Sequence, residues 1–182
     1  MSGKVNLVEY IYPKMDILFL ALNAPDVSNS NEHWFSYNLS FWNLLFESEL
    51  ISQRIWNKLE GDVKVFGDNS INYKSWIYGV TDLNRDVVQT NSSGILTTNA
   101  HVKRILDIID NSKIKKLCLM HSKVEKQFEK DGFITRGSGS IEGYGKVGKY
   151  KDTIIYEVPF HNASISNKNI IYGLLKNKIE KQ

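Results

Sequence analysis

The stretch that decides the fold is residues 16–46, DILFLALNAPDVSNSNEHWFSYNLSFWNLLF. It opens with an unbroken apolar run, residues 17–22, which is short enough for a strand buried on both faces of a parallel sheet. The run stops at Asn23, and Pro25 cannot continue a ladder of backbone hydrogen bonds. A polar side chain therefore follows a predicted central strand, at the sheet edge where open α/β folds bind ligands.

The segment after this strand is predicted to be a polar loop and then a helix. The loop carries four ring side chains, His33, Trp34, Phe35 and Tyr37. Asn38 or Ser40 can cap the helix, whose apolar residues 41, 44 and 45 recur at helical spacing. Residues 44–59 are expected to form helical segments that are broken near Ser52.

Later apolar runs predict the remaining sheet. Strands are expected at residues 76–80, 116–120 and 153–159, and helices at about 98–111, 122–131 and 167–179. Residues 5–12 fit either a helical turn or an edge strand. Strands separated by helices imply crossover connections. We therefore expect a single domain over residues 1–182, a three-layer α/β/α fold with a central, mainly parallel four-stranded sheet.

Composition narrows the class of protein. The net charge of +3 and the pI near 8.8 are compatible with a nucleic-acid partner without indicating one. A single cysteine, Cys118, excludes an intrachain disulfide and a four-cysteine iron–sulfur cluster. No apolar run is long enough to span a membrane, and no signal peptide is visible. We expect a soluble, cytoplasmic monomer without membrane contact.

Residues 132–148, GFITRGSGSIEGYGKVG, are rich in glycine. They lack the Gly-Lys-Ser/Thr of a phosphate-binding loop and do not lead from a strand into a helix. A surface loop or hairpin is the favoured interpretation, and a backbone contact with a DNA phosphate is the alternative.

Three segments together resemble the uracil-DNA glycosylase superfamily, especially its mismatch-specific and single-strand-selective branches. Residues 21–25, ALNAP, and then Phe35 and residues 39–42, LSFW, resemble the first motif, Gly-x-Asn-Pro-Gly, an aromatic and Asn-Arg-Phe-Trp. Residues 78–85, YGVTDLNR, resemble Gly-Ile-Thr-Asn-Leu-Val-x-Arg. Residues 161–166, HNASIS, resemble His-Pro-Ser-Pro-Leu-Ser. The resemblance covers about residues 15–178.

The resemblance implies a monofunctional DNA glycosylase, which excises a uracil-like or 5-modified pyrimidine and leaves an abasic site. In that family Asn23 would position the water and His161 would donate to the anionic base. Phe35 or Trp34 would stack on the flipped base, and Asp82 or Asn84 would orient the base or support Asn23. No metal or organic cofactor is expected.

The resemblance also implies how DNA is held. Ile165 would fill the space that the flipped base vacates. Four polar residues would contact phosphates, namely Arg85, Ser164, Ser166 and Lys168. Pro25 stands where the uracil-specific branch has an aromatic that blocks pyrimidine C5, so the base could be thymine-like, deaminated, oxidised or a 5-modified cytosine. Repair and defence against bacteriophage both remain open, and uracil remains if Trp34 or Tyr37 refills the space.

Two other classes of function stay open. A catalytically inactive relative would bind DNA or a protein partner, as the replacement of the motif's glycines and prolines by Ala21, Ala24 and Pro25 allows. A small nucleotide-binding α/β domain would share the alternation of strands and helices. It would need a phosphate loop after the first strand, and Asn-Ala-Pro-Asp is not one.

Overall fold

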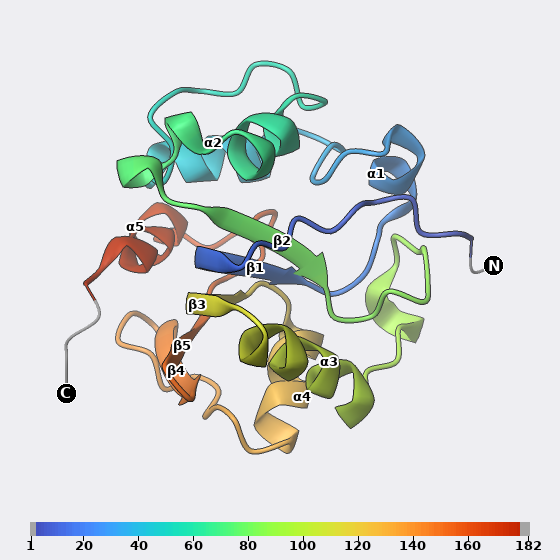
Figure 1. Cartoon of the computed structure of the whole chain (residues 1–182), viewed down its shortest axis with the longest axis vertical. Coiled ribbons are helices and arrows are strands. Elements are labelled where there is room, and N and C mark those ends of the chain that lie inside the picture. Colours follow the sequence, from blue (N-terminus) through green and yellow to red (C-terminus); the bar gives the residue numbers. More distant parts are fainter. Residues whose placement is uncertain (1–2, 179–182) are drawn as a thin grey trace.

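A five-stranded sheet lies at the centre of the fold (Figure 1). The computed structural model describes residues 3–178. The strand order is β2-β1-β3-β5-β4. The strands are β1 (Lys14–Ala21), β2 (Tyr78–Asp82), β3 (Lys113–Leu119), β4 (Gly145–Tyr150) and β5 (Thr153–Glu157). The four predicted strands are thus present, although β1 begins earlier and β2 runs on to Asp82.

These four strands pair in parallel and end at one edge of the sheet. Leu20 of β1 is opposite Thr81 of β2 and Leu119 of β3, and Leu119 is opposite Glu157 of β5. Their apolar runs are buried along nearly their whole length. Such continuous burial is expected of parallel strands, because helices cover both faces of their sheet.

Two hydrophobic cores lie on opposite faces of the sheet and explain the layered architecture. One core contains Phe41 and Trp42 of α2 (Ser40–Glu47) and Ile171 of α5 (Lys168–Gly173). The other contains Ile105 of α3 (Asn99–Asp110) and Phe128 of α4 (Ser122–Lys130). Figure 1 shows the two sets of helices on either side of the sheet. The predicted α/β class is confirmed.

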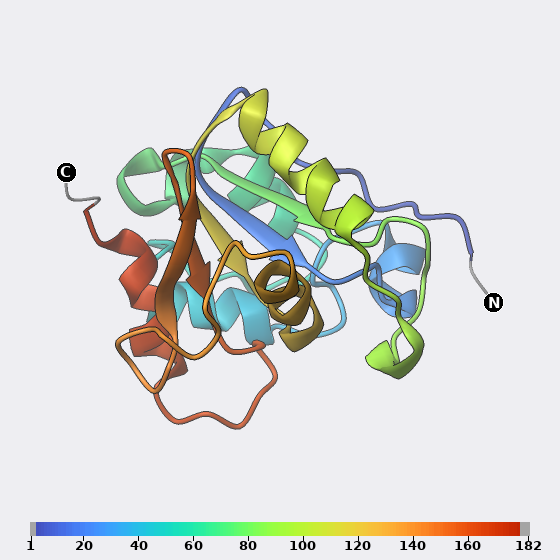
Figure 2. The ribbon, with the colours of Figure 1, turned by 90° about the horizontal axis from the view of Figure 1, so that it is seen from below.

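The prediction of a four-stranded sheet is wrong, because β4 adds a fifth strand. β4 pairs antiparallel with β5 through the turn at residues 151–152, and this hairpin stands at the edge of the sheet (Figure 2). Its sequence, GKVGKY, has two glycines and two lysines, which weaken any strand signal. The favoured interpretation of residues 132–148, a surface loop or hairpin, is therefore correct for the end of that stretch, where β4 begins.

Three helix predictions need correction. The helical interpretation of residues 44–59 fails after α2, because Glu49 adopts φ 62° and Ile51 forms a bridge with Asn72. The predicted loop after β1 contains a short helix, α1 (Asp26–Asn31). The last helix ends at Gly173 and continues only as the 3₁₀ turn Leu174–Lys176; its predicted end, Ile179, lies outside the described residues.

Short helical turns complete the chain. Val63–Gly67 is a π-helix, and Asn69–Ile71, Tyr73–Ser75 and Ser92–Gly94 are 3₁₀ turns. Helices α3 and α4 fall where they were predicted. Among the described residues, no helix has the length and apolar character needed to cross a membrane.

Residues 5–12 form neither a helix nor a full strand. They run along the outer edge of β2, where Tyr10 makes one antiparallel bridge to Val80. This bridge covers part of an otherwise open sheet edge.

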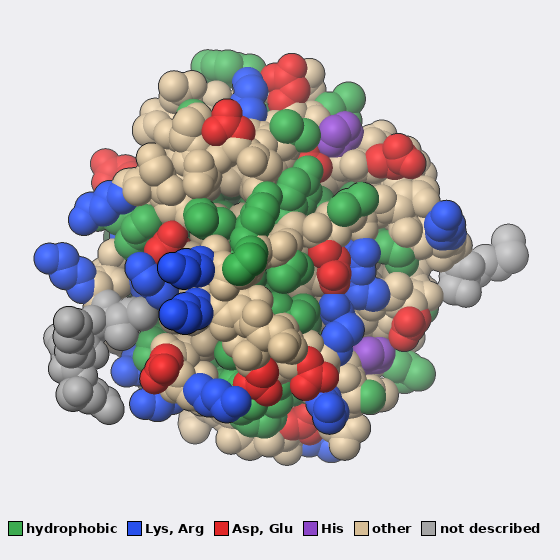
Figure 3. All heavy atoms as spheres, viewed as in Figure 1, with side chains coloured by type: hydrophobic (Ala, Val, Ile, Leu, Met, Phe, Trp, Pro, Cys, Tyr) green, Lys and Arg blue, Asp and Glu red, His purple; other side chains and the backbone are tan. Residues whose placement is uncertain are grey.

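On the face of the molecule drawn in Figure 3, cationic and anionic side chains are interspersed around a band of hydrophobic ones.

Gly79 allows this close packing, so replacing it should destabilise the protein. A Cβ at Gly79 would lie 2.3 Å from the Met15 sulfur and 2.6 Å from the Tyr10 carbonyl oxygen. We expect Gly79→Ala to lower the free energy of unfolding by about 1–3 kcal/mol, the usual cost of overpacking. Gly67→Ala is the matched control, because its Cβ would meet only ordinary contacts at 3.7 Å and beyond. Equal urea midpoints for the two variants would contradict this account.

Candidate functional site

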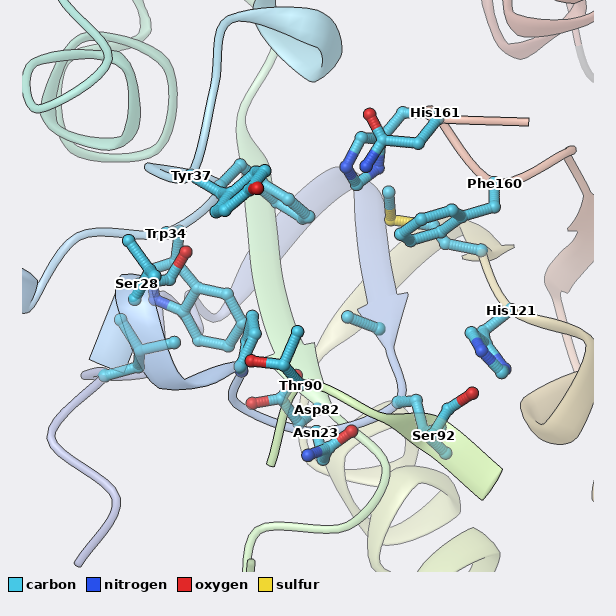
Figure 4. A pocket seen from close by; sticks show the side chains of 18 of the residues that line it. Asn23, Ser28, Trp34, Tyr37, Asp82, Thr90, Ser92, His121, Phe160 and His161 are labelled. Atoms are coloured by element: carbon cyan, nitrogen blue, oxygen red, sulfur yellow. The ribbon is translucent and has the colours of Figure 1, made fainter. Parts of the chain in front are cut away.

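A cavity of about 390 Å³ opens at the carboxyl edge of the parallel strands (Figure 4). Residues that follow β1, β3 and β5 all reach it: Asn23, His121 and His161. Its volume falls in the range of roughly 300–1,000 Å³ that is usual for ligand pockets. Asn23 and Asp82 lie toward one end of the cavity in Figure 4, and His161 lies toward the other.

Asn23 is held in one orientation by backbone carbonyls. Its Nδ2 donates to the carbonyl of Gln89 at 2.9 Å and to that of Ala24 at 3.2 Å. Because both partners are acceptors, the amide nitrogen must face them and the oxygen Oδ1 must face away. An amide oxygen fixed in this way can accept a hydrogen bond from a water molecule or a ligand.

His161 is a neutral imidazole at the opposite wall. Burial is the main cause that lowers its pKa to about 4, and the nearby Lys168 ammonium lowers it further. Its Nδ1 is buried and has no hydrogen-bond partner among the described residues. Lys168 Nζ donates to the His161 carbonyl at 2.7 Å and so braces this loop. A neutral histidine can donate one hydrogen bond to a ligand without carrying a charge.

The aromatic wall of the cavity is built by the loop between α1 and α2. Phe35 adopts φ 51°, an uncommon conformation for a bulky residue. Its ring stacks on Phe41 with centroids 3.9 Å apart and meets His161 edge-on at 5.6 Å. Trp34 is almost fully buried, and its indole donates to the Val8 carbonyl at 2.7 Å. Both rings therefore line the cavity from fixed positions, and their stacking on a base stays a prediction.

Buried Asp62 anchors this loop. Its Oδ2 accepts from the Trp34 backbone N–H at 3.0 Å, and its Oδ1 lies 2.9 Å from Nδ1 of His33. His33 is absent from the cavity wall. Its role is therefore to hold the loop that carries Trp34 and Phe35.

Asp82 is a fully buried carboxyl beside the cavity. Neither carboxyl oxygen has a hydrogen-bond partner among residues 3–178, and the nearest cation is Arg85 Nη1 at 3.6 Å. Burial raises its pKa from 3.8 to about 7 and Glu9 raises it slightly, while Arg85 and Arg104 act in the opposite direction. A carboxyl group in this state exchanges its proton near neutral pH.

A second, smaller hollow shares His161 with the cavity. This side groove, of about 280 Å³, is lined by Ser40, Asn43, Leu44, Glu47, His161, Ile165, Ser166, Lys168 and Asn169. Three of the predicted DNA-contacting residues, Ile165, Ser166 and Lys168, thus lie together beside His161. Ile165 is half-buried and packs against the core, so its side chain protrudes less than a residue that fills the space of a flipped base would need to.

Three predicted site residues lie elsewhere. Asn84 is buried, donates to the Leu96 carbonyl at 2.9 Å and accepts from the Asp86 backbone, so it holds a loop. Arg85 donates to the Leu7 carbonyl at 2.7 Å and pairs with Glu9. These contacts turn the guanidinium of Arg85 toward the protein. Ser164 is exposed and lines neither hollow. The phosphate role of Arg85 and the base-binding role of Asn84 therefore lack structural support.

His121 is a cavity residue that sequence reasoning missed. Its Nδ1 accepts from the Lys123 backbone N–H at 3.0 Å, so in the neutral form Nε2 carries the proton. Burial lowers its pKa, as do Lys123 and Lys126. The sequence contained a signal for His121, because this polar residue follows β3 in the same way as Asn23 follows β1.

The segment at residues 89–92 is a second part of the wall that the sequence did not indicate. Thr90 lines the cavity, and its hydroxyl donates to Asp26 Oδ2 at 2.7 Å. The Gln89 backbone N–H donates to the Ala24 carbonyl at 2.9 Å. This segment comes from a loop without apolar periodicity, so its contacts with residues 23–26 place it at the site.

Among the described residues, no three His, Cys, Asp or Glu side chains are arranged to hold a metal ion. No protein-family model matches the chain, and no curated protein matches it.

The raised pKa of Asp82 predicts a pH-dependent effect on stability. Because the folded carboxyl binds its proton more tightly than the unfolded one, its contribution to stability is lost as pH rises from about 4 to about 7. Asp82→Asn stays neutral at every pH. We expect it to raise the free energy of unfolding near pH 8 by up to roughly 4 kcal/mol, with a gain that shrinks toward pH 4.

Thermal or urea unfolding at several pH values measures this difference. Asp107→Asn is the control, because its side chain is 55% exposed and should show no such trend. An Asp82→Asn protein that is less stable than wild type near pH 8 would mean that the ion pair with Arg85 outweighs the cost of burial.

Proposed function

We propose that this chain is a monofunctional DNA glycosylase that flips a uracil-like or 5-modified pyrimidine out of DNA and hydrolyses its N-glycosidic bond. One observation carries the proposal. Asn23 and His161, which lie far apart in the sequence, line the same cavity. Asn23 offers a fixed acceptor, and His161 is a neutral donor at the opposite end.

The chemistry needs these two kinds of group. As the bond between C1′ of the sugar and the base nitrogen breaks, its electron pair stays with the base. His161 donates a hydrogen bond to the base oxygen where negative charge develops, and the burial of His161 strengthens that bond. Asn23 Oδ1 accepts from a water molecule that adds to C1′. The water keeps one proton on the new C1′ hydroxyl and releases the other to solvent, and the base anion takes up a proton from solvent, so the products are the free base and an abasic sugar.

The hydrolytic, monofunctional course is supported by what lines the cavity. An enzyme that also cleaves the strand uses an amine to form a Schiff base with the sugar. None of the described residues that line the cavity is a lysine. Lys168 lies in the side groove, where its Nζ is bonded to the His161 carbonyl.

The parallel part of the sheet, in the order β2-β1-β3-β5, is compatible with a glycosylase-like fold.

The residues that line the cavity then determine which base it accepts. Pro25 lines the cavity where the uracil-specific branch of the resembled superfamily has a blocking aromatic, but Trp34 and Tyr37 line it as well. His121 adds a donor that suits a carbonyl oxygen of the base. Pocket shape and such contacts to exocyclic groups set base choice in flipping enzymes.

A panel of substrates tests the activity directly. We expect the wild-type protein to release at least one base from otherwise identical oligonucleotides that carry uracil, 5-hydroxymethyluracil, thymine opposite guanine, hypoxanthine or glucosylated hydroxymethylcytosine. Alkaline cleavage of the abasic product provides the readout. Activity on uracil alone would refute the open-pocket interpretation of Pro25, and no release from any substrate would overturn the glycosylase proposal.

Two variants test the assigned roles. On the best substrate, His161→Ala should slow single-turnover excision by roughly 10²–10³-fold, as loss of one oxyanion donor does. Asn23→Ala should cost on the order of 10²–10⁴-fold. DNA affinity and circular dichroism should barely change. His101→Ala removes a histidine outside the cavity and should keep the wild-type rate; a rate within tenfold of wild type for His161→Ala would contradict its role.

A further inference from the structure

An exposed tryptophan stands on a segment that the glycosylase chemistry does not use. Residues 54–58 read RIWNK and belong to no helix or strand. Ile55 is 1% exposed and fixes the segment to the core, whereas the next residue, Trp56, is 80% exposed. So large an exposed ring adds little to folding, because the hydrophobic effect rewards only surface that is removed from water. An aromatic presented in this way is available to a partner.

Two cations flank Trp56 in the sequence, and one of them, Arg54, lies near its ring. The Arg54 guanidinium carbon lies 4.5 Å from the centre of the Phe46 ring and 5.8 Å from that of Trp56. Its Nη1 donates to Asn43 Oδ1 at 3.0 Å, which fixes its direction. Lys58 follows two residues after Trp56, and no acidic residue lies between Arg54 and Lys58. The segment therefore combines one aromatic face with two positive charges.

Both ends of the segment are tied to the walls of the two hollows. Lys58 Nζ donates to the Tyr37 carbonyl at 3.1 Å, and Tyr37 lines the cavity and is 63% exposed. Asn43, which holds Arg54, lines the side groove. His161 belongs to both hollows. A polynucleotide that delivers one base to the cavity would therefore continue past Tyr37 toward Trp56.

We propose that the segment 54–58 is a binding platform for single-stranded DNA, on which Trp56 stacks with an unpaired base beside the nucleotide held in the cavity. Arg54 and Lys58 meet the phosphates on either side of that base. The platform rests on the proposed glycosylase function in one respect: that function supplies the nucleotide held in the cavity. Stacking on aromatic rings combined with cations along the backbone is how proteins hold single strands without reading their sequence.

The geometry favours an unpaired strand over a duplex and over a protein partner. In a duplex both faces of each base are already stacked on their neighbours, so no face is free for a surface tryptophan. The centre of a protein–protein interface is depleted in lysine, although arginine is common there. Here Arg54, Asn57 and Lys58 flank Trp56 in the sequence, and the lysine is the residue that such a centre lacks. The platform thus predicts that the protein prefers single-stranded or locally unpaired substrates.

Tryptophan fluorescence tests the proposal without reference to excision. Of the four tryptophans, Trp34 and Trp42 are buried and Trp76 is half-buried, so iodide quenching reports mainly Trp56. Titration with oligo(dT) should quench the emission and protect it from iodide. Trp56→Ala should lose this response and weaken oligo(dT) binding by about five- to a hundredfold, whereas Trp56→Phe should retain most of the affinity.

Leu96→Ala is the matched control, because it truncates another hydrophobic side chain, 75% exposed, outside the segment. It should bind oligo(dT) as the wild type does. Replacing both Arg54 and Lys58 by Gln should reduce the salt dependence of binding, by about 0.7 in the logarithmic slope for each phosphate that the protein no longer neutralises.

Several results would overturn the platform. Oligo(dT) that binds without changing the Trp56 emission would do so, as would equal affinity of Trp56→Ala and wild type. Tighter binding to a blunt duplex than to oligo(dT) would overturn it too. None of these results depends on base release, so the platform can fail while the glycosylase proposal stands. Conversely, the platform survives if oligo(dT) protects Trp56 and no base is excised.

Discussion

The parallel pairing of β1, β3 and β5 is the constraint on which the rest of the molecule depends. Leu20 pairs with Leu119, and Leu119 pairs with Glu157, so these three strands stop at the same edge. Helices cover both faces of the sheet, so most side chains along the strands are apolar and buried, although polar ones such as Lys116 and Thr153 are buried there too. Polar side chains that line an open cavity gather where the strands end. Asn23, His121 and His161 follow those ends, and the cavity lies among them.

Burial then sets the charge of the cavity. It lowers the pKa of His161 to about 4 and raises that of Asp82 to about 7, so one physical cause moves both groups toward their neutral forms. A neutral, buried donor suits a reaction in which charge develops only as the bond breaks. A permanently charged wall would instead bind anions in the ground state, which does not accelerate the chemical step.

The cavity and its rim divide the proposed work between two kinds of interaction. Inside, hydrogen bonds from fixed groups act on one base, and the loop that carries Phe35 is anchored by Asp62. Outside, Trp56 with its neighbouring cations offers stacking and charge to the rest of a strand. The net charge of only +3 gives no strong attractive field. Local contacts at the rim are therefore a more suitable source of DNA affinity than the overall charge.

The sequence by itself determined the α/β class, the four parallel strands and two of the groups at their ends, Asn23 and His161. His161 follows from the resemblance of residues 161–166 to a family motif. The class, the strands and Asn23 follow from local signals, since apolar runs and the polar residues that interrupt them are visible without any long-range contact. The same signals failed for β4, whose glycines hide a strand that exists only because β5 offers a partner.

The tertiary structure decided which polar residues became part of the site. The sequence predicts a DNA contact for Arg85, but its guanidinium instead donates to the Leu7 carbonyl and pairs with Glu9. Thr90 joins the cavity wall because Asp26 binds it from a distant part of the chain. Burial, which is the main cause that shifts the pKa of Asp82 and of His161, is a property of everything packed around a residue. No local pattern contains that information, because the atoms that exclude water come from other segments of the chain.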